Sequence, residues 1–192
     1  ADLTPGDEGF VSSEQGTGQS GAFSRRTAVG DLPYFFPVGS SFNPSGGNDF
    51  IYRPAEVTVQ SDNVNRYEVR FTHEDPTLSG YDVLKLDDEL CSVNPRYFHV
   101  VNHTQGFDTA NLAIWYNPLE DDIFDKIAQW NTVQDTIWNN TTQTASVNAG
   151  GAFEKLIIND WTVFSADTLP FALSDVSPEK PIIDGPQRVC SG

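Results

Sequence analysis

Apolar and polar side chains alternate over much of the stretch from residue 32 to residue 173, and this pattern predicts short β-strands. In the runs 57–59 and 67–71, every second residue is apolar and the residues between them are polar. A strand directs successive side chains to opposite sides, so each run is expected to bury one side and expose the other. A polar turn from Ser61 to Asn65 joins these two predicted strands.

Further runs rich in β-branched and aromatic residues are separated by turn residues, which raises the expected number of strands to nine or ten. These runs are Tyr97 to Asn102, Asn111 to Tyr116, Ile123 to Trp130, Thr136 to Trp138, Ala145 to Val147, Phe153 to Ile158, Trp161 to Ser165 and Phe171 to Leu173. The run from Ile123 to Trp130 also fits a short helix, but the turn residue Asn131 favours a strand. The pattern predicts an all-β fold, an antiparallel β-sandwich of the jelly-roll or immunoglobulin-like type.

The chain divides into three predicted parts. Residues 1–30 are rich in small and polar residues and are expected to form an extended N-terminal arm. Residues 31–176 form the predicted β-sandwich domain, which includes a long loop over 76–90 with one expected helical turn at Asp87 to Leu90. Residues 177–192 are interpreted as a linker followed by a terminal strand.

The strong negative charge excludes some classes of partner. The 27 acidic and 11 basic residues give a formal net charge of −16, which repels nucleic-acid phosphates and anionic lipid headgroups. No run of about 18 apolar residues occurs, so no membrane insertion is expected. Because the chain has no methionine, Ala1 is expected to follow a removed segment, of which a cleaved secretory signal is the simplest kind. The expected location is therefore extracellular, at a cell surface.

The two cysteines, Cys91 and Cys190, are candidates for a disulfide bond. Such a bond is compatible with export, because disulfides persist in oxidising compartments. It would join residues of one chain or of neighbouring copies. Two free thiols remain an alternative.

Motifs of common enzymes do not occur in the sequence. There is no zinc-protease His-Glu pattern, no nucleophile elbow and no phosphate-binding loop, so no catalytic residue and no cofactor is expected. His99 and His103 have the spacing of metal ligands on a helix, but their alternating context predicts a strand. The four-residue acidic cluster offers a weak calcium site, with an ordinary acidic turn as the alternative. Its members are Glu120, Asp121, Asp122 and Asp125.

Large side chains in the sequence favour a structural interpretation. The planar guanidinium of Arg53 can stack on a ring and bind a carboxylate with two hydrogen bonds, as a structural pin more often than as a ligand site. The four tryptophans are expected to pack in the core or on a sheet face rather than to form a sugar-binding platform. They are Trp115, Trp130, Trp138 and Trp161.

Several short pieces, in the same order, resemble a β-sandwich module of secreted Bacteroidota surface and adhesin proteins that are cargo of type IX secretion. They are Phe36 to Gly39, Tyr52 to Pro54, Cys91, Asn94 to Tyr97, Ala128 to Asn131, Trp161 to Ser165 and Pro170 to Leu173. The tail from Ile183 to Gly192 is similar to the first strand of the immunoglobulin-like repeats that follow such modules.

Glycans are expected as covalent additions. The resemblance implies O-glycosylation at Asp-Thr motifs, which carries over to Thr109, Thr136 and Thr168. Asn102, Asn139 and Asn140 each begin a sequon for N-linked glycans. Either kind of glycan would be expected on exposed loops.

These features predict a structural or adhesive subunit that is not an enzyme. In the leading hypothesis, a terminal segment donates a strand to a neighbouring copy, and repeated head-to-tail donation builds a surface filament. The partners would then be other copies or adjacent modules of the same protein. One alternative is a plain bead in a multidomain adhesin, and another is a carbohydrate-binding module in which exposed Trp130 or Trp138 stacks on sugar rings.

Overall fold

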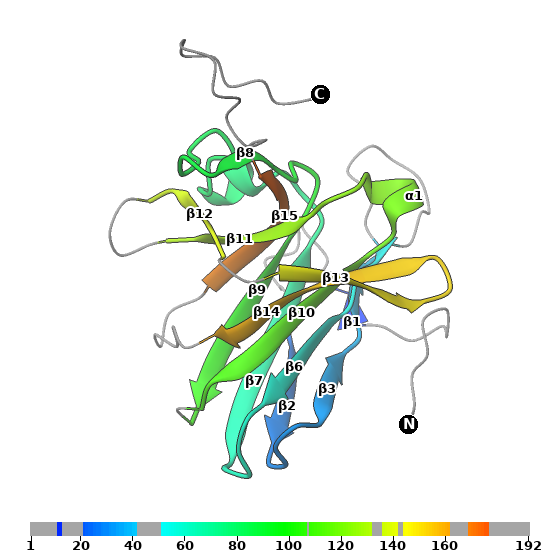
Figure 1. Ribbon diagram of the computed structural model, residues 1–192, viewed down its shortest axis with the longest axis vertical. Coiled ribbons are helices and arrows are strands. Elements are labelled where there is room, and N and C mark those ends of the chain that lie inside the picture. The colour runs from blue at the N-terminus through cyan, green and yellow to red at the C-terminus, as the bar shows by residue number, and fades with distance from the viewer. Residues whose placement is uncertain are drawn as a thin grey trace.

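The computed structural model describes residues 11–12, 21–41, 51–106, 108–131, 136–141, 144–161 and 169–176. Within these ranges the chain is built almost wholly from strands, and its sheets are mostly antiparallel (Figure 1). The predicted all-β sandwich is therefore confirmed. No helix among the described residues combines the length and apolar character that crossing a membrane requires.

Two sheets form the body of the sandwich and a third is small. The five-stranded sheet has the order β13(Thr144–Gly150), β14(Phe153–Trp161), β10(Ala110–Tyr116), β6(Ala55–Val59), β3(Pro33–Phe36). The seven-stranded sheet has the order β12(Trp138–Asn140), β11(Lys126–Trp130), β15(Leu169–Val176), β9(Phe98–Gln105), β7(Asn65–Thr72), β2(Phe23–Thr27), with β8(Leu90–Val93) paired to β15. The small sheet joins β1(Val11–Ser12), β4(Val38–Ser40) and β5(Ile51–Tyr52).

The main core lies between the two large sheets, because alternate side chains of both sheets point inward. Its buried members include Val57 and Val59 from one sheet and Tyr67, Val69 and Phe71 from the other. These are the apolar positions of the two runs from which strands were predicted. Period-2 patterning therefore identified the buried side of each strand correctly.

A second cluster, here called the satellite core, lies on the outer side of the seven-stranded sheet. It consists of Leu90, Val93, Phe98, Val100, Ala128, Trp130, Trp138 and Ala172. The loop between β7 and β8 covers it with the partly buried side chains of Tyr81, Val83 and Leu86. The long loop thus provides apolar cover for part of the outer side of the seven-stranded sheet.

The connection between β6 and β7 crosses from one sheet to the other. β6 pairs with β3 and β10, whereas β7 pairs with β2 and β9. The turn predicted between these strands therefore links two layers of the sandwich. Alternation defines which side of a strand is buried, but it does not define the neighbouring strand.

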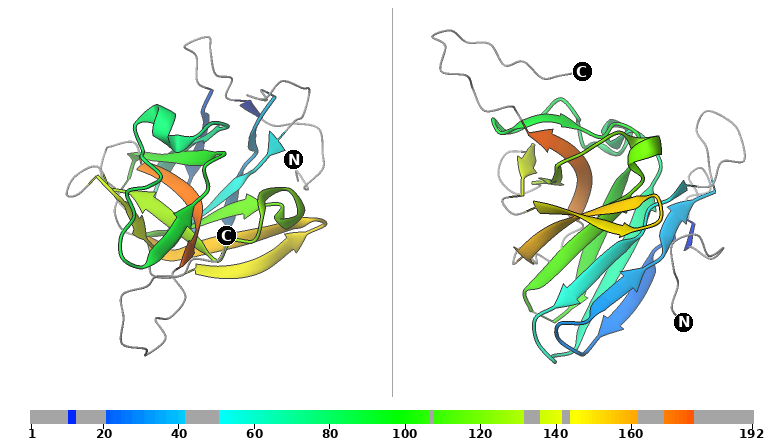
Figure 2. Two further views of the ribbon diagram at one scale, coloured as in Figure 1. Left: turned by 90° about the horizontal axis from the view of Figure 1, so that it is seen from above. Right: turned by 45° about the vertical axis from the view of Figure 1, so that its right-hand side comes forward.

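Part of the expected N-terminal arm lies in the sandwich. β2 pairs in register with β7, from Phe23 opposite Val69 to Thr27 opposite Asn65. It forms the edge of the seven-stranded sheet, next to β3 at the edge of the other sheet (Figures 1 and 2).

The run ending at Trp130 forms the strand β11, as predicted, although the strand begins only at Lys126. The short helix α1(Pro118–Asp121) precedes it. The helical turn expected at Asp87 to Leu90 was wrong. A 3₁₀ helix, η1(Pro76–Ser79), lies earlier in that loop, because Asp75 caps it and Pro76 begins it.

Candidate functional site

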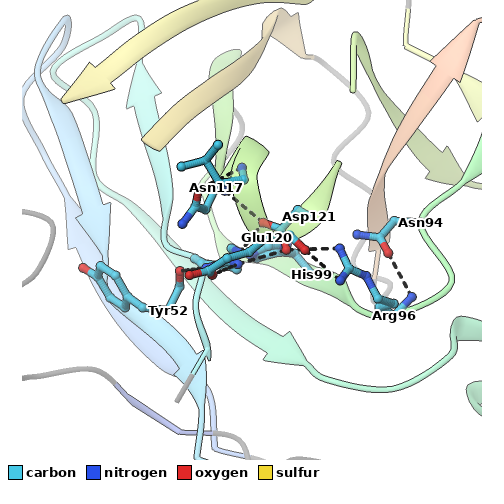
Figure 3. Close-up of polar contacts among 9 residues, drawn as sticks. Tyr52, Asn94, Arg96, His99, Asn117, Glu120 and Asp121 are labelled. Carbon is cyan, nitrogen blue, oxygen red and sulfur yellow. Dashed lines mark hydrogen bonds and ion pairs between the residues drawn. The ribbon is translucent and has the colours of Figure 1, made fainter. Parts of the chain in front are cut away.

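The most extensive buried polar cluster joins β5, β6 and α1 around Arg53. The Nε and Nη2 atoms of Arg53 donate to the two carboxylate oxygens of Asp121, at 2.5 and 2.9 Å. Nη2 also donates to Glu120 at 2.7 Å, and Nη1 donates to the backbone oxygen of Tyr52 at 2.7 Å (Figure 3). Arg53 and Asp121 are almost fully buried.

Local structure on both sides holds the two partners in place. Arg53 lies between β5 and β6 and donates its backbone N–H to the backbone oxygen of Val38 in β4, which fixes this stretch of chain. On the other side, Asn117 caps α1 and donates its backbone N–H to Asp121 at 2.9 Å. Pro118 occupies the first turn, where its missing N–H leaves no helical bond unmade. The backbone of α1 and its cap therefore orient the carboxylate of Asp121 toward Arg53.

Aromatic rings and a histidine complete the cluster. The guanidinium of Arg53 lies over the rings of Tyr97 and Phe153, at 5.9 Å from each centroid. His99 Nε2 is 2.7 Å from the backbone oxygen of Arg53, so the ring donates there as a neutral imidazole. The predicted role of Arg53 as a stacked, two-pronged pin is confirmed.

Burial and charge shift the protonation of three groups in the cluster. Burial alone lowers the pKa of Arg53, but the hydrogen bond to Asp121 and nearby negative charge raise that pKa above its ordinary value. Burial, followed by the charge of Asp121, raises the pKa of Tyr97. Burial lowers the pKa of His99 to about 4. The cluster therefore has a charged arginine and a neutral histidine at neutral pH.

The calcium candidates have other partners. Glu120 and Asp121 bind Arg53, and Arg96 adds a contact of 3.4 Å to Asp121. Asp125 accepts a hydrogen bond from the backbone of Val176 at 3.2 Å, and Asp122 is exposed. Among the described residues, no three His, Cys, Asp or Glu side chains gather closely enough to hold a metal ion.

A second polar cluster lies at the far end of the sandwich, where the β6–β7 turn meets the start of β10. Asp108 accepts hydrogen bonds from the side chains of Ser61, Asn63 and Asn65 at 2.5, 3.0 and 2.7 Å. These hydrogen bonds lower the pKa of Asp108, and the bond from Ser61 has the largest effect. Asn65 in turn bonds His103 at 2.9 Å. The cluster fixes the crossing between the two sheets.

The glycosylation candidates differ in exposure. Thr136 is exposed, Thr109 is half-buried, and Thr168 lies outside the described residues. Asn102 is half-buried within β9, opposite Glu68 of β7. Of the β12 pair, Asn139 and Asn140 are half-buried, and the Asn140 amide donates to Glu89 at 2.8 Å.

Cys91 lies in β8 and is disulfide-bonded. The only other cysteine of the sequence is Cys190, which lies outside the described residues. β8 pairs with β15, the last described strand, at the end of the sandwich that also carries α1 (Figures 1 and 2).

Sequence reasoning found only part of these arrangements. It identified Arg53 as a pin but named its partner Asp121 only as a weak calcium candidate within an acidic turn, because sequence spacing does not show which carboxylate a distant arginine meets. It did not single out Asp108 or Asn65. Their signal is the density of Ser, Asn and Asp around a turn, which favours side-chain hydrogen bonds to nearby groups.

Comparison with known proteins does not identify the chain. No protein-family model, curated protein or solved structure matches it. The resemblance to Bacteroidota surface modules remains a prediction, and the function must be inferred from the described residues.

Proposed function

We propose that the chain is an extracellular structural or adhesive β-sandwich module of a surface protein. The observation that carries this proposal is the disulfide bond of Cys91. Disulfides of this kind persist in oxidising compartments and are rare where thiols are kept reduced. Cys91 lies in β8, which pairs with β15. A disulfide bond stabilises a fold mainly by restricting the unfolded state.

The internal construction supports a mechanical role. The pin around Arg53 ties β5 and β6 to α1, and the cluster around Asp108 ties the sheet crossing to β10. These two clusters lie at opposite ends of the main core, so both ends of the sandwich are held by hydrogen bonds between distant segments. A rigid unit of this kind suits a bead or a subunit under load.

Self-assembly by strand donation is a second candidate, and the edge strand β13 favours it. Among the described strands, β13 pairs only with β14, and its sequence contains neither a charged residue nor a proline. Other edges carry the usual protection against added strands: β2 has Arg25 and Arg26, and β3 begins with Pro33. β13 is thus the edge best suited to accept a strand. Of the terminal segments that would donate one, the described parts of the N-terminal arm pair within their own chain, β1 with β4 and β2 with β7. Residues 1–10, 13–20 and 177–192 lie outside the described residues.

The carbohydrate-binding alternative has less support. Trp130 and Trp138 are 4% and 0% exposed and pack in the satellite core. A ring that stacks on a sugar must present a face to solvent, so these two side chains are unsuited to that role. Trp115 and Trp161 are also buried.

The test is the covalent state of the protein isolated from its native source. Alkylation of the unfolded protein before and after reduction, followed by intact mass measurement, should show no reactive thiol before reduction and two afterwards. The same mass would reveal glycans at the candidate threonines and asparagines. Two thiols that react without reduction, in protein recovered from a reducing compartment, would contradict an extracellular role.

A further inference from the structure

Two arginines lie side by side on the outer surface of the seven-stranded sheet. Arg26 of β2 is the direct partner of Arg66 of β7, and both side chains are exposed. Neither forms an ion pair with a described residue. Like charges directly opposite one another on neighbouring strands are unfavourable in an isolated sheet. This pair, here called the basic row, therefore favours an external anion.

Protection of a sheet edge explains only half of the basic row. A charge on the edge strand β2 discourages the addition of another strand, which accounts for Arg26. Arg66 lies on β7, which has neighbours on both sides, so no edge needs protection there. Arg66, Glu68 and Arg70 are each two residues apart along β7, so their side chains point to the same side of the sheet.

Next to the basic row, the same surface has a shallow polar hollow of about 60 Å³. It is lined by Ala22, Glu68, Arg70, Val100 and Asn102. The side-chain oxygen of Asn102 is buried and accepts no hydrogen bond from a described residue. The hollow could therefore receive a donor group from a bound partner.

Another part of this surface is acidic. Residues 74–89, here called the acidic loop, contain six acidic residues and one lysine, which gives a net charge of 1 − 6 = −5. The loop covers the satellite core, whose member Val100 also lines the hollow. Arg66 and Arg70 are four residues apart along β7, which corresponds to about 13 Å along the strand. Arg70 lines the hollow, and the acidic loop begins shortly after the end of β7.

The acidic loop is held in shape and presents charge outward. Asp87 accepts hydrogen bonds from the backbones of Glu89 and Asn140, at 2.9 and 2.5 Å. Its own backbone N–H donates to Trp138 at 2.9 Å. Asp88 and Glu89 are exposed beside this anchor. A pre-organised loop loses little conformational freedom when it binds.

We propose that the basic row of one copy binds the acidic loop of a second copy of this chain. A long polyanion bound along this surface would contact the acidic loop as well as the arginines, and the chain's net charge of −16 would repel it. The acidic loop of a second copy brings acidic groups to the basic row, whereas the other acidic residues of that copy do not take part in this contact. This contact extends the proposed structural role by naming a partner, and it does not depend on the disulfide.

The experiment is analytical ultracentrifugation of the full chain at about 0.15 M salt, where repulsion between distant charges is screened. We expect concentration-dependent association that weakens at about 1 M salt. Arg26→Gln with Arg66→Gln should weaken it by about tenfold or more. The matched control, Leu119→Asp with Ile123→Asp, changes two exposed side chains outside the basic row, the acidic loop and β13. It adds the same net charge of −2 and should leave association unchanged.

A charge exchange makes the test specific. Arg26→Glu/Arg66→Glu and Asp88→Lys/Glu89→Lys should each fail to self-associate, and an equimolar mixture of the two should associate again. A wild-type chain that stays monomeric up to about 1 mM would overturn the proposal. A mixture of the two variants that does not associate would also overturn it. The same holds if the wild-type chain binds dextran sulfate but does not self-associate, and Arg26→Gln/Arg66→Gln abolishes that binding, because the basic row would then bind a polyanion. Thiol measurements test the proposed function separately.

Discussion

Arg53 and Asp121 are 68 residues apart in the sequence, yet they meet inside the protein through hydrogen bonds of 2.5 and 2.9 Å. Both are nearly excluded from water. A buried charge is tolerated only when its partner compensates for the lost hydration. Removing one partner should therefore lower the free energy of unfolding more than replacing both partners by apolar residues would.

Asp121→Asn should lower the free energy of unfolding by about 3–5 kcal/mol, because it leaves the Arg53 charge buried without its carboxylate. Equilibrium unfolding in urea measures this change. Asp122→Asn is the control, since Asp122 is exposed and asparagine has nearly the same shape as aspartate, so the substitution leaves the backbone at φ 77° unchanged. A loss below about 1 kcal/mol for Asp121→Asn would mean that the pair is not the pin described here.

The partnership also shows what the sequence could and could not predict. Alternation at Val57, Val59 and Val69 identified strands and their buried sides, because burial repeats every two residues. The shape of Arg53 indicated a pin. Its partner could not be predicted, because it depends on how β6 and α1 meet in space.

Strand neighbours were equally hidden. Nothing in residues 55–72 shows that β6 and β7 belong to different sheets, since both have the same alternation. The assignment of Phe23–Thr27 to the edge of a sheet depended on pairing with β7, whereas its own sequence is mostly polar. Local pattern defines elements, and tertiary contacts choose their partners.

Acidification should destabilise the protein between about pH 6.5 and pH 4 because of His99. The unfolded histidine binds a proton near pH 6.5, whereas burial lowers the folded pKa to about 4. Between these values the unfolded state holds more protons, so stability falls as pH falls, by roughly 3 kcal/mol in total. Below about pH 4 this contribution is fully lost.

Urea unfolding at several pH values measures the slope, and His99→Gln should flatten it while keeping a donor for the Arg53 carbonyl. Two carboxyl groups elsewhere in the protein act differently. Asp108, with a lowered pKa, loses its contribution only below its ordinary value of 3.8, and the raised pKa of Asp175 opposes the effect of His99. An unchanged slope in His99→Gln would contradict the assignment to His99.

Trp138→Ala should destabilise the fold by about 3–5 kcal/mol, since Trp138 is fully buried in the satellite core against Trp130. Chemical denaturation followed by circular dichroism measures the loss. Leu84→Ala is the control from the same region, because Leu84 is 86% exposed and should change stability by less than about 0.5 kcal/mol. Equal effects of the two variants would show that the loop does not cover a core.

Gly106→Ala should destabilise the chain more than Gly80→Ala, although both glycines have left-handed backbones, with φ of 101° and 91°. At Gly80 an added methyl group meets nothing within 4 Å, so the cost is the backbone conformation alone, about 1–2 kcal/mol. At Gly106 the same methyl group overlaps the amide of Asn65 and lies 3.0 Å from the backbone oxygen of Val64.

That overlap forces Asn65 away from Asp108 and His103, so the second substitution also disturbs the cluster at the sheet crossing. The difference between the two losses in free energy of unfolding isolates this packing effect. Asn65→Ala combined with Gly106→Ala relieves the overlap, so the effects of the two substitutions should be less than additive. Strict additivity, or equal losses at the two glycines, would show that Gly106 does not support the Asn65 cluster.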